Sequence, residues 1–482
     1  MPPTFRQLLG INAGKEWDQL YNQNNSYGYN PLLNIFSHVR SFHLMEDDYP
    51  KGELPSTAKP DVQLEKSGGW GRMNNYNARY KRWSQDFETI RVSLTGIVAF
   101  DKKTKKARFR KFPSKWYSKA DWGGDFKSIK ANGKRYGEAF FRLHIPLSNK
   151  IAPLISTVEI GNEPWGDIGI EGYQAVIKGV IEAYKEYYGN APLLTLSSAA
   201  FQAHQPKHVW KCRECNYPSG DYVAKMLDEE IYSNLHELNI HPYSFLIGSV
   251  KLIEPPESES SDFSHAQSMF AYRRRIGRPD MKISATEFGW DSNTVGETAQ
   301  AAYTLRNILL MSRMGFHKCY LYEGLDSPRI KGLYGSSGLF TVKMPGRHIL
   351  KPKLIYKSLL QFMNILGDLQ FKAVIQEDEE AYIYLIGNEQ KNTHLVAWCP
   401  LNINQQNNAD QSDWVSLPDF TRQYKVVPST SFFKLDGDIQ LDEQLRCQTL
   451  GKRYETKEYW KRQQGGVRLK LGAVPYVFLL EK

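Results

Sequence analysis

The sequence predicts an α/β protein in which a (β/α)8 barrel spans residues 1–369 and an all-β sandwich spans residues 370–482. Two observations carry this prediction. Eight short apolar runs alternate with helical patterns over about 365 residues, as in a barrel of parallel strands and helices. After Gly367 the helical patterns stop, and short strand-like runs separated by turn residues replace them.

The eight barrel strands are predicted from short apolar runs rich in β-branched residues. Their periodicity alone also fits an open, doubly wound sheet, and the count of eight favours the closed barrel. In chain order the predicted strands are residues 8–13, 36–45, 89–100, 158–163, 193–201, 238–245, 281–290 and 318–326.

Helices are predicted between and after these strands, where apolar residues recur at helical spacing. Glycines that follow a periodic run, such as Gly189 and Gly315, indicate C-terminal caps. Pro352 is expected in the first turn of the last helix, which Gly367 ends. The predicted helices are residues 172–189, 221–238, 296–315 and 351–367.

The C-terminal region reads as short strands joined by turns, which predicts a β-sandwich. The Asn/Gln-rich segment 402–412 is expected to be a loop. The predicted strands are residues 381–387, 394–401, 423–429, 466–472 and 475–481.

Composition limits the possible location of the protein. The chain is 41% hydrophobic but has no run of about 18 apolar residues, so no membrane span is expected. Its first residues, MPPTFRQLLGINAG, lack the apolar region of a signal peptide. The expectation is a cytoplasmic protein, or a secreted, periplasmic or cell-surface one if a signal peptide has been removed. Five cysteines, an odd number, argue against a disulfide framework.

The net charge of +10 is partly concentrated in residues 101–111, which carry seven basic side chains. This run is either a solvated loop or a contact for an anionic ligand. Nucleic acid is not expected as a partner, because no nucleic-acid-binding motif accompanies the run. Aromatic residues make up 13% of the chain, and their flat rings suit either sugar stacking or core packing.

Two glutamates stand at predicted strand ends. Glu163 ends the fourth strand within Gly161-Asn162-Glu163-Pro164, and Glu287 ends the seventh. In a parallel barrel the carboxyl ends of the strands build the active site. Two carboxylates over one cleft suit glycoside hydrolysis, whereas the alternative is a pair of salt-bridged strand-end residues.

In these motifs the sequence resembles clan A of the glycoside hydrolases, the retaining TIM-barrel glycosidases. The resemblance implies that Glu163 is the acid/base and Glu287 the nucleophile, with their carboxyl groups about 5 Å apart. It implies that Asn162 binds the sugar 2-hydroxyl, and it implies no cofactor and no metal. A protonated Glu163 needs a raised pKa, to which desolvation by Trp165 would contribute.

Further residues match supporting positions of the clan, each with a purely structural alternative. Arg40 matches an arginine that holds the nucleophile ionised, or is a solvent-facing strand residue. Tyr243 matches a tyrosine that bonds the nucleophile and His241 lines the neighbouring pocket, or both belong to the core. Trp290 is either a subsite wall or packing, and Glu323 either binds sugar hydroxyls or pairs with Arg329.

The spacing of His208, Cys212 and Cys215 resembles that of metal ligands. No fourth ligand is evident nearby, and two loop thiols or a local disulfide are the simpler alternatives. We therefore expect no metal site in this segment.

The sequence thus predicts a retaining glycoside hydrolase, similar to family 39 and to marine-galactan families such as 86. Long segments after predicted strands favour endo action, and the basic run favours an anionic, sulfated or uronate-bearing polysaccharide. One alternative is an exo-acting β-xylosidase or β-galactosidase on neutral oligosaccharides. The other is a noncatalytic carbohydrate-binding protein. No motif specifies the sugar, the linkage or an oligomeric state, and the sandwich either braces the barrel or binds carbohydrate.

Overall fold

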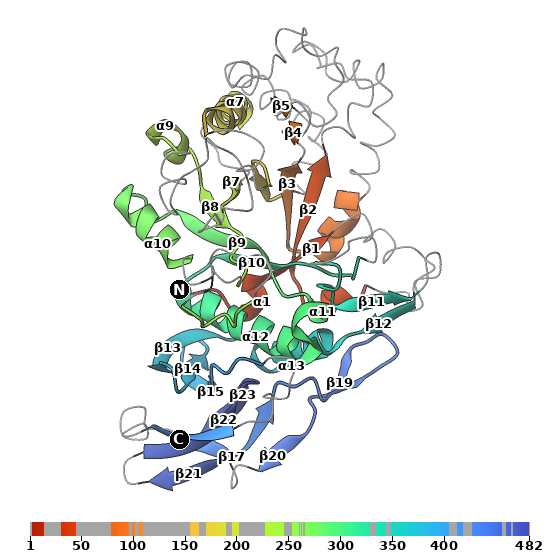
Figure 1. Cartoon of the computed structure of the whole chain (residues 1–482), viewed down its shortest axis with the longest axis vertical. Helices are drawn as coiled ribbons and strands as arrows, with labels where there is room; N and C mark the ends of the chain where they lie inside the picture. The colour runs from red at the N-terminus through yellow and green to blue at the C-terminus, as the bar shows by residue number, and fades with distance from the viewer. Residues whose placement is uncertain are drawn as a thin grey trace. The chain divides into compact units, whose positions relative to one another are not determined.

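A computed structural model of the chain defines the fold (Figure 1). Two compact units make up the chain. The first unit comprises residues 1–36, 243–264 and 287–482, and the second comprises residues 37–242 and 265–286. The structure describes residues 2–13, 30–44, 79–95, 99–101, 106–108, 155–162, 170–188, 195–201, 227–244, 253–259, 261, 263, 266–327, 334–343, 349–403, 412–417, 427–455, 459–463 and 466–481.

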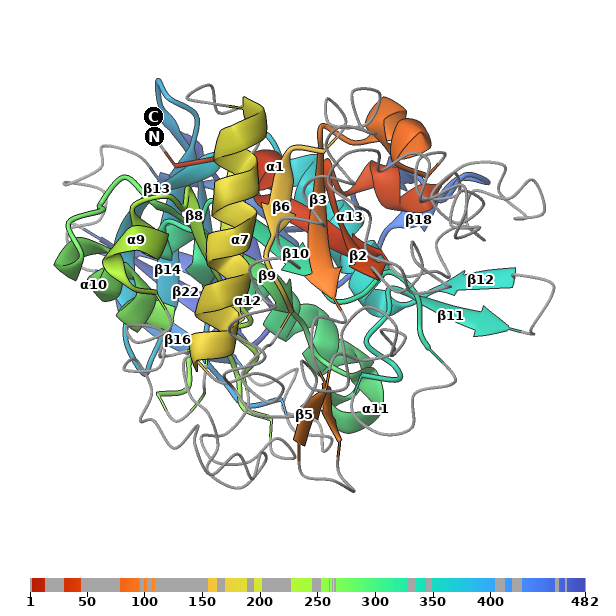
Figure 2. The ribbon, with the colours of Figure 1, turned by 90° about the horizontal axis from the view of Figure 1, so that it is seen from above.

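Eight parallel strands form a closed barrel in the order β1-β10-β9-β8-β7-β6-β3-β2, which confirms the predicted fold class. Each lies within or overlaps one of the eight predicted segments. Within the second unit, β2, β3 and β6 pair as neighbours (Figure 2). The strands are β1 (Leu9–Ala13), β2 (His38–Leu44), β3 (Thr89–Thr95), β6 (Thr157–Glu159), β7 (Thr195–Phe201), β8 (Glu237–Ile240), β9 (Lys282–Phe288) and β10 (Lys318–Leu321).

Several predicted barrel strands are too long. The sixth ends at Ile240 rather than at residue 245, and the third and eighth show the same error. The third ends at Thr95, and β4 (Ala99–Asp101) instead pairs antiparallel with β5 (Lys106–Arg108) in a separate small sheet. The eighth ends at Leu321 rather than at residue 326. Apolar residues continue past the last paired residue in each case, and hydrophobicity alone does not mark where a ladder ends.

Three of the four predicted helices have nearly the predicted bounds, and the structure adds shorter ones. The predicted helix 221–238 is wrong at its end, because β8 begins at Glu237 and the described helix there is α9. The labelled helices are α1 (Phe5–Leu8), η1 (Pro31–Asn34), α7 (Ile170–Tyr188), α9 (Glu229–Tyr232), α10 (Ala266–Arg275), α11 (Ser292–Val295), α12 (Glu297–Met314) and α13 (Leu354–Leu366), and residues 79–86 are helical as well.

The glycines that end α12 and α13 differ in backbone conformation. Gly315 follows α12 with φ 86°, the left-handed conformation predicted for a glycine cap, and its N–H bonds to carbonyls of the last turn. Gly367 caps α13 in an ordinary right-handed helical conformation. Pro352 is not in the first turn of α13; it ends strand β12 (Ile349–Pro352), which pairs with β11 (Phe340–Lys343), and Lys353 is the N-cap.

The left-handed backbone of Gly315 leads to a stability prediction. Replacing Gly315 with Ala is expected to lower the free energy of unfolding by about 1–2 kcal/mol, because a Cβ is unfavourable at this φ. Urea denaturation measures the change. Gly315→Asn is the matched control and should lose less, since asparagine tolerates this conformation better. Equal losses for both variants would contradict the prediction.

After α13 the chain forms two antiparallel sheets that enclose a common core, as the predicted sandwich requires. Three strands of the larger sheet, β13, β14 and β15, run side by side in Figure 1. Leu385, Leu395, Phe432, Leu469 and Phe478 are fully or almost fully buried in this core. The larger sheet has the order β13-β14-β15-β23-β17-β20 and the smaller β16-β22-β21.

Four of the five predicted C-terminal strands are confirmed. The fifth, 423–429, overlaps β17 only from Val427, its residues 423–426 lie outside the described ranges, and β17 continues to Lys434. Several other strands were missed. β16 begins at Ser412, the last residue of the predicted loop, of which residues 404–411 lie outside the described ranges. The boundary predicted between residues 369 and 370 stays a prediction. The strands here are β13 (Gln370–Glu377), β14 (Tyr382–Gly387), β15 (Asn392–Trp398), β16 (Ser412–Leu417), β17 (Val427–Lys434), β18 (Gln440–Leu441), β19 (Cys447–Thr449), β20 (Arg453–Glu455), β21 (Trp460–Gln463), β22 (Gly466–Gly472) and β23 (Tyr476–Glu481).

No helix within the described residues combines the length and apolarity needed to cross a membrane.

Candidate active site

Glu287 stands at the end of β9, as predicted, and only 6% of it is exposed. The hydroxyl of Tyr243, which follows β8, donates a hydrogen bond of 2.9 Å to Oε2 of Glu287. Tyr243 is itself buried, and its ring packs edge-on against Tyr334 with centroids 5.4 Å apart. Tyr334 also contacts Tyr322, which follows β10. The structure thus brings the predicted tyrosine and glutamate together within the first unit, on an aromatic support.

Gly289 lets the backbone after Glu287 pass close to β10. Its φ is 150°, and a Cβ at this position would lie 2.5 Å from the carbonyl oxygen of Tyr322. The Tyr322 N–H donates to the Phe288 carbonyl at 2.8 Å, which ties the ends of the two strands together. A side chain at Gly289 would push these strand ends apart and move Glu287.

His241 belongs to a buried hydrogen-bonded chain in the second unit. The Thr286 hydroxyl donates to Oδ1 of Asn239, so its oxygen accepts from Nε2 of His241 at 3.1 Å. Asn239 in turn donates to the carbonyl of Ser198 at 2.9 Å. This chain fixes the backbone residue that precedes Glu287. The predicted role of His241 in lining a sugar pocket stays a prediction.

Arg40 and Asn162 meet in the second unit, together with a residue that the sequence analysis missed. Arg40 binds Glu159 in a bidentate ion pair, with Nε to Oε2 at 2.9 Å and Nη2 to Oε1 at 2.7 Å. Nη2 also donates to Oδ1 of Asn162 at 2.7 Å. Since Oδ1 of Asn162 accepts from Arg40, its amide NH2 group points elsewhere. The predicted action of Arg40 on Glu287 stays a prediction.

A second buried ion pair lies next to the first. Arg91 pairs with Glu237, and its Nη1 lies 3.9 Å from Oε2 of Glu159. Arg40, Glu159, Arg91 and Glu237 are all at most 1% exposed. Burial raises the pKa of Glu159, but the charge and hydrogen bonds of Arg40, with the charges of Arg91 and His241, outweigh it. The pKa of Glu159 is therefore lowered, and the carboxylate is ionised.

The other predicted residues of the first unit lie near strand ends. Trp290 is 2% exposed and packs against Tyr303, and its carbonyl accepts a hydrogen bond from Gln300 at 2.8 Å. Glu323 is half-buried just after β10, and its peptide bond with Tyr322 is cis. Subsite roles for Trp290 and Glu323 stay predictions.

Two aspartates that follow Trp290 and Glu323 in the sequence have structural partners. Asp291 caps α11 and accepts from the backbone N–H of Ser336 at 2.7 Å. Asp326 accepts from Lys353 at 3.1 Å. Burial raises the pKa of Asp326, and the Lys353 ammonium offsets part of that rise.

Several predicted residues lie outside the described ranges. Among them are the acid/base Glu163, its neighbour Trp165, and Arg329, together with His208, Cys212, Cys215 and most of the basic run 101–111. Over the described residues, His, Cys, Asp and Glu side chains form no group of three that could hold a metal ion.

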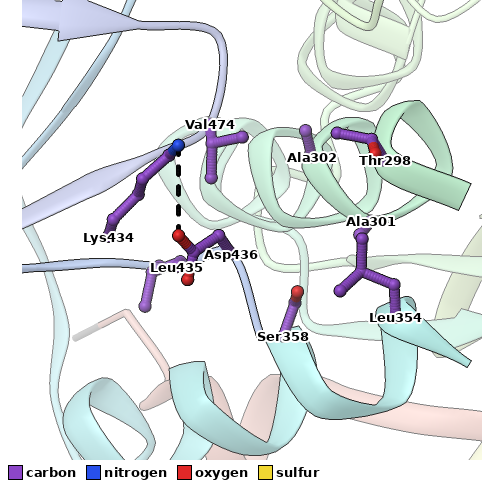
Figure 3. A pocket seen from close by; sticks show the side chains of 9 residues that line it. All are labelled: Thr298, Ala301, Ala302, Leu354, Ser358, Lys434, Leu435, Asp436 and Val474. Carbon is purple, nitrogen blue, oxygen red and sulfur yellow. Dashed lines mark ion pairs between the residues drawn. The ribbon is translucent and has the colours of Figure 1, made fainter. Parts of the chain in front are cut away.

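A cavity of ≈ 220 Å³ lies in the first unit, lined by α12, α13 and the ends of sandwich strands. Figure 3 shows Lys434 and Asp436 facing each other on one side of it, with Nζ and Oδ2 3.9 Å apart. Small side chains such as Ala301 and Ala302 leave the space open. The lining includes no predicted site residue, so this cavity is not the candidate active site.

The Tyr243–Glu287 bond leads to an activity prediction. If Glu287 is the nucleophile that the sequence predicts, Tyr243→Phe is expected to lower kcat for glycoside hydrolysis by about 10- to 100-fold, because a hydrogen bond to this carboxylate is lost. Steady-state kinetics on the best polysaccharide substrate measures the loss.

The control for this variant is Tyr384→Phe in the sandwich. Tyr384 is another buried tyrosine, and its hydroxyl donates to Glu377 at 3.1 Å. Tyr384→Phe should leave kcat unchanged. Equal effects of Tyr243→Phe and Tyr384→Phe on kcat would contradict a special role for Tyr243.

Comparison with solved structures shows which fold this is. A family 39 glycoside hydrolase from the gut symbiont Bacteroides cellulosilyticus WH2 superposes with a TM-score of 0.61 at 14% identity, over 99% of this chain and 82% of that one. AbfB, a family 51 α-L-arabinofuranosidase from Bifidobacterium longum, gives 0.53 at 13% identity, over 100% and 98%. A family 86 β-porphyranase from the human gut bacterium Bacteroides plebeius gives 0.50 at 10% identity, over 81% and 62%.

No protein-family model matches the sequence. No curated protein matches it either. These three structural neighbours are glycoside hydrolases, and the chain shares their fold.

Proposed function

We propose that the chain is a retaining glycoside hydrolase that uses Glu287 as nucleophile and Glu163 as acid/base. The observation that carries the proposal is the Tyr243–Glu287 hydrogen bond at the end of β9. It holds a nearly buried carboxylate at the end of a barrel strand, where barrel enzymes place their catalytic groups. The clan A fold of the structural neighbours supports the same reading.

The proposed reaction is a double displacement. Glu287 attacks the anomeric carbon and forms a covalent glycosyl-enzyme, while Glu163 protonates the leaving oxygen. Glu163 then deprotonates a water molecule that hydrolyses the intermediate. Tyr243 limits rotation of the Glu287 carboxylate, and Arg40 orients the Asn162 amide so that its NH2 group faces away from the guanidinium. That orientation supports a role for Asn162 as donor to the sugar 2-hydroxyl.

The proposed substrate is an anionic polysaccharide cut by endo action. Two features support it: the seven basic residues within 101–111, and the resemblance to the family 86 β-porphyranase. An exo-acting β-glycosidase on neutral oligosaccharides is the alternative within the same reaction. The proposal assigns the site to the barrel and leaves the sandwich outside the chemistry.

The test is release of reducing ends from sulfated, uronate-bearing and neutral polysaccharides. We expect oligosaccharides from a sulfated or uronate-bearing polymer, with products that first appear in the anomeric configuration of the substrate. Monosaccharides alone would replace endo by exo action. Inverted products would contradict the retaining mechanism, and no release from any polymer or oligosaccharide would contradict the glycosidase.

A further inference from the structure

The outer face of the small sandwich sheet carries three cations around one tryptophan. Side chains alternate along its strands, so Val415 and Leu469 lie in the core while their neighbours in sequence point outward. Arg468 and Lys470 project outward from β22, Lys461 from β21 and Trp414 from β16. We call these four residues the cationic face.

The four residues form two cross-strand pairs, and the Lys470 ammonium lies 6.0 Å from the centroid of the Tyr459 ring. Trp414 stands opposite Lys470 in the ladder, and Lys461 stands opposite Arg468. Nζ of Lys461 lies 4.8 Å from the centroid of the Trp414 ring, and the guanidinium carbon of Arg468 lies 5.6 Å from it. The ring therefore holds two cations near each other by cation–π attraction.

Within the described residues, no acidic side chain pairs with these charges. The outward positions of the three strands carry no Asp or Glu, and Asp413 points to the opposite face from Trp414. Among the described residues, no ion pair joins Lys461, Arg468 or Lys470 to a carboxylate. Like charges directly opposite each other in a ladder are destabilising. The like charges of Lys461 and Arg468 therefore repel each other, and a bound anion would relieve that repulsion.

We propose that the cationic face binds the sulfate or carboxylate groups of an anionic polysaccharide. Arg468 supplies a planar fork of N–H donors that matches either group, and the two lysines supply point charges beside it. Arg468 and Lys470 are two residues apart on one strand, about 7 Å, so successive charged groups of an extended polymer can reach both.

A polysaccharide fits this face better than a nucleic acid. Proteins that bind single strands stack bases on free aromatic rings, whereas the Trp414 ring is engaged by two cations. The choice of carbohydrate rests on the proposed function, because the fold is that of glycoside hydrolases. The face itself contains none of the residues proposed for catalysis, and its binding is measurable without turnover.

The experiment is affinity electrophoresis of the full chain through gels that contain carrageenan, polygalacturonate, dextran or duplex DNA. The test variant carries Lys461→Gln, Arg468→Gln and Lys470→Gln together. The control carries Lys351→Gln, Lys391→Gln and Lys452→Gln, three exposed lysines of the first unit outside the cationic face. Both variants lose the same charge.

We expect the wild type to be retarded by carrageenan or polygalacturonate and not by dextran. The test variant should raise the apparent Kd for that polymer roughly tenfold or more, because charge-assisted contacts are lost. The control should stay within about twofold, since long-range attraction between exposed charges is screened. Lys461→Gln alone should show a smaller loss, and it serves as the test if the triple variant does not fold.

Three results would overturn the inference: no retardation by either anionic polymer, equal losses in test and control variants, or tighter binding of duplex DNA through the same residues. The assay is repeated with Glu287→Gln, which separates the two proposals. Retardation without hydrolysis by the wild type would leave the cationic face standing and remove the proposed function. Hydrolysis without retardation would support the proposed function and overturn the proposed role of the cationic face.

Discussion

Glu287→Gln is expected to lower kcat for polysaccharide hydrolysis by roughly 10,000-fold or more, the largest effect that the proposed mechanism predicts. The amide keeps the size of the carboxylate and can still accept from the Tyr243 hydroxyl, which donates to Oε2 at 2.9 Å in the wild type. It cannot attack an anomeric carbon, so the covalent intermediate does not form. The loss is measured as the rate of reducing-end release by the wild type and the variant from the same polysaccharide.

Two further variants test whether the loss of activity is specific to the nucleophile. Glu389→Gln changes an exposed glutamate of the same unit and should leave kcat unchanged. Glu287→Ala opens space beside Tyr243, and added azide should restore turnover by attacking the sugar in place of the carboxylate. If Glu287→Gln keeps more than about one tenth of the activity, Glu287 is not the nucleophile. If both glutamine variants lose activity equally, the loss reflects damage to the fold.

The barrel could be predicted from the sequence because its strands are buried on both faces and read as apolar runs. Strands with mixed exposure could not. β13 is half-exposed along most of its length, so its apolar residues show no alternation. β16 has only Val415 and Leu417 buried, within a polar stretch. Leu235 and Leu238 are three residues apart, and this helical spacing masked the start of β8.

The residues of the candidate site that belong to a sequence motif could be predicted. The residues whose partners depend on packing between strands could not. Glu287 and Tyr243 were predicted as partners, and the structure joins them. Glu159, Arg91 and Glu237 were missed, although each is a charged residue of a buried barrel strand. In a buried strand such a charge needs a partner. Their partners follow from register across four strands, which a single sequence does not display.

This buried group of charges spans neighbouring strands of the second unit. Glu159 on β6 accepts from Arg40 on β2 through both carboxylate oxygens, and Ser93 on β3 donates to Oε1 at 3.3 Å. Arg91 and Glu237 complete it beside Ser197. All the charged members are essentially inaccessible to water. The free energy of the fold therefore depends on their mutual compensation more than on any surface ion pair.

Glu159→Gln is expected to lower the free energy of unfolding at pH 7 by about 3–5 kcal/mol, because it leaves the Arg40 guanidinium buried without its carboxylate. Urea denaturation measures the change. Glu88→Gln, at an exposed position just before β3, should stay within about 0.5 kcal/mol of the wild type. Combining Arg40→Met with Glu159→Met should recover most of the loss, since both charges are then gone.

The pH dependence of this difference tests the charge directly. The pKa of Glu159 is lowered in the folded chain, so its ionised form stabilises the fold above the unfolded pKa of about 4.3. That contribution is lost as pH falls through the folded pKa. The gap between wild type and Glu159→Gln should therefore be constant from pH 8 to 5 and shrink below about pH 4. Burial lowers the pKa of His394 to about 4, but this residue is present in both proteins and cancels in the difference. A gap that stays constant at low pH, or a loss below about 1 kcal/mol at pH 7, would mean that the buried carboxylate is not what holds these strands together.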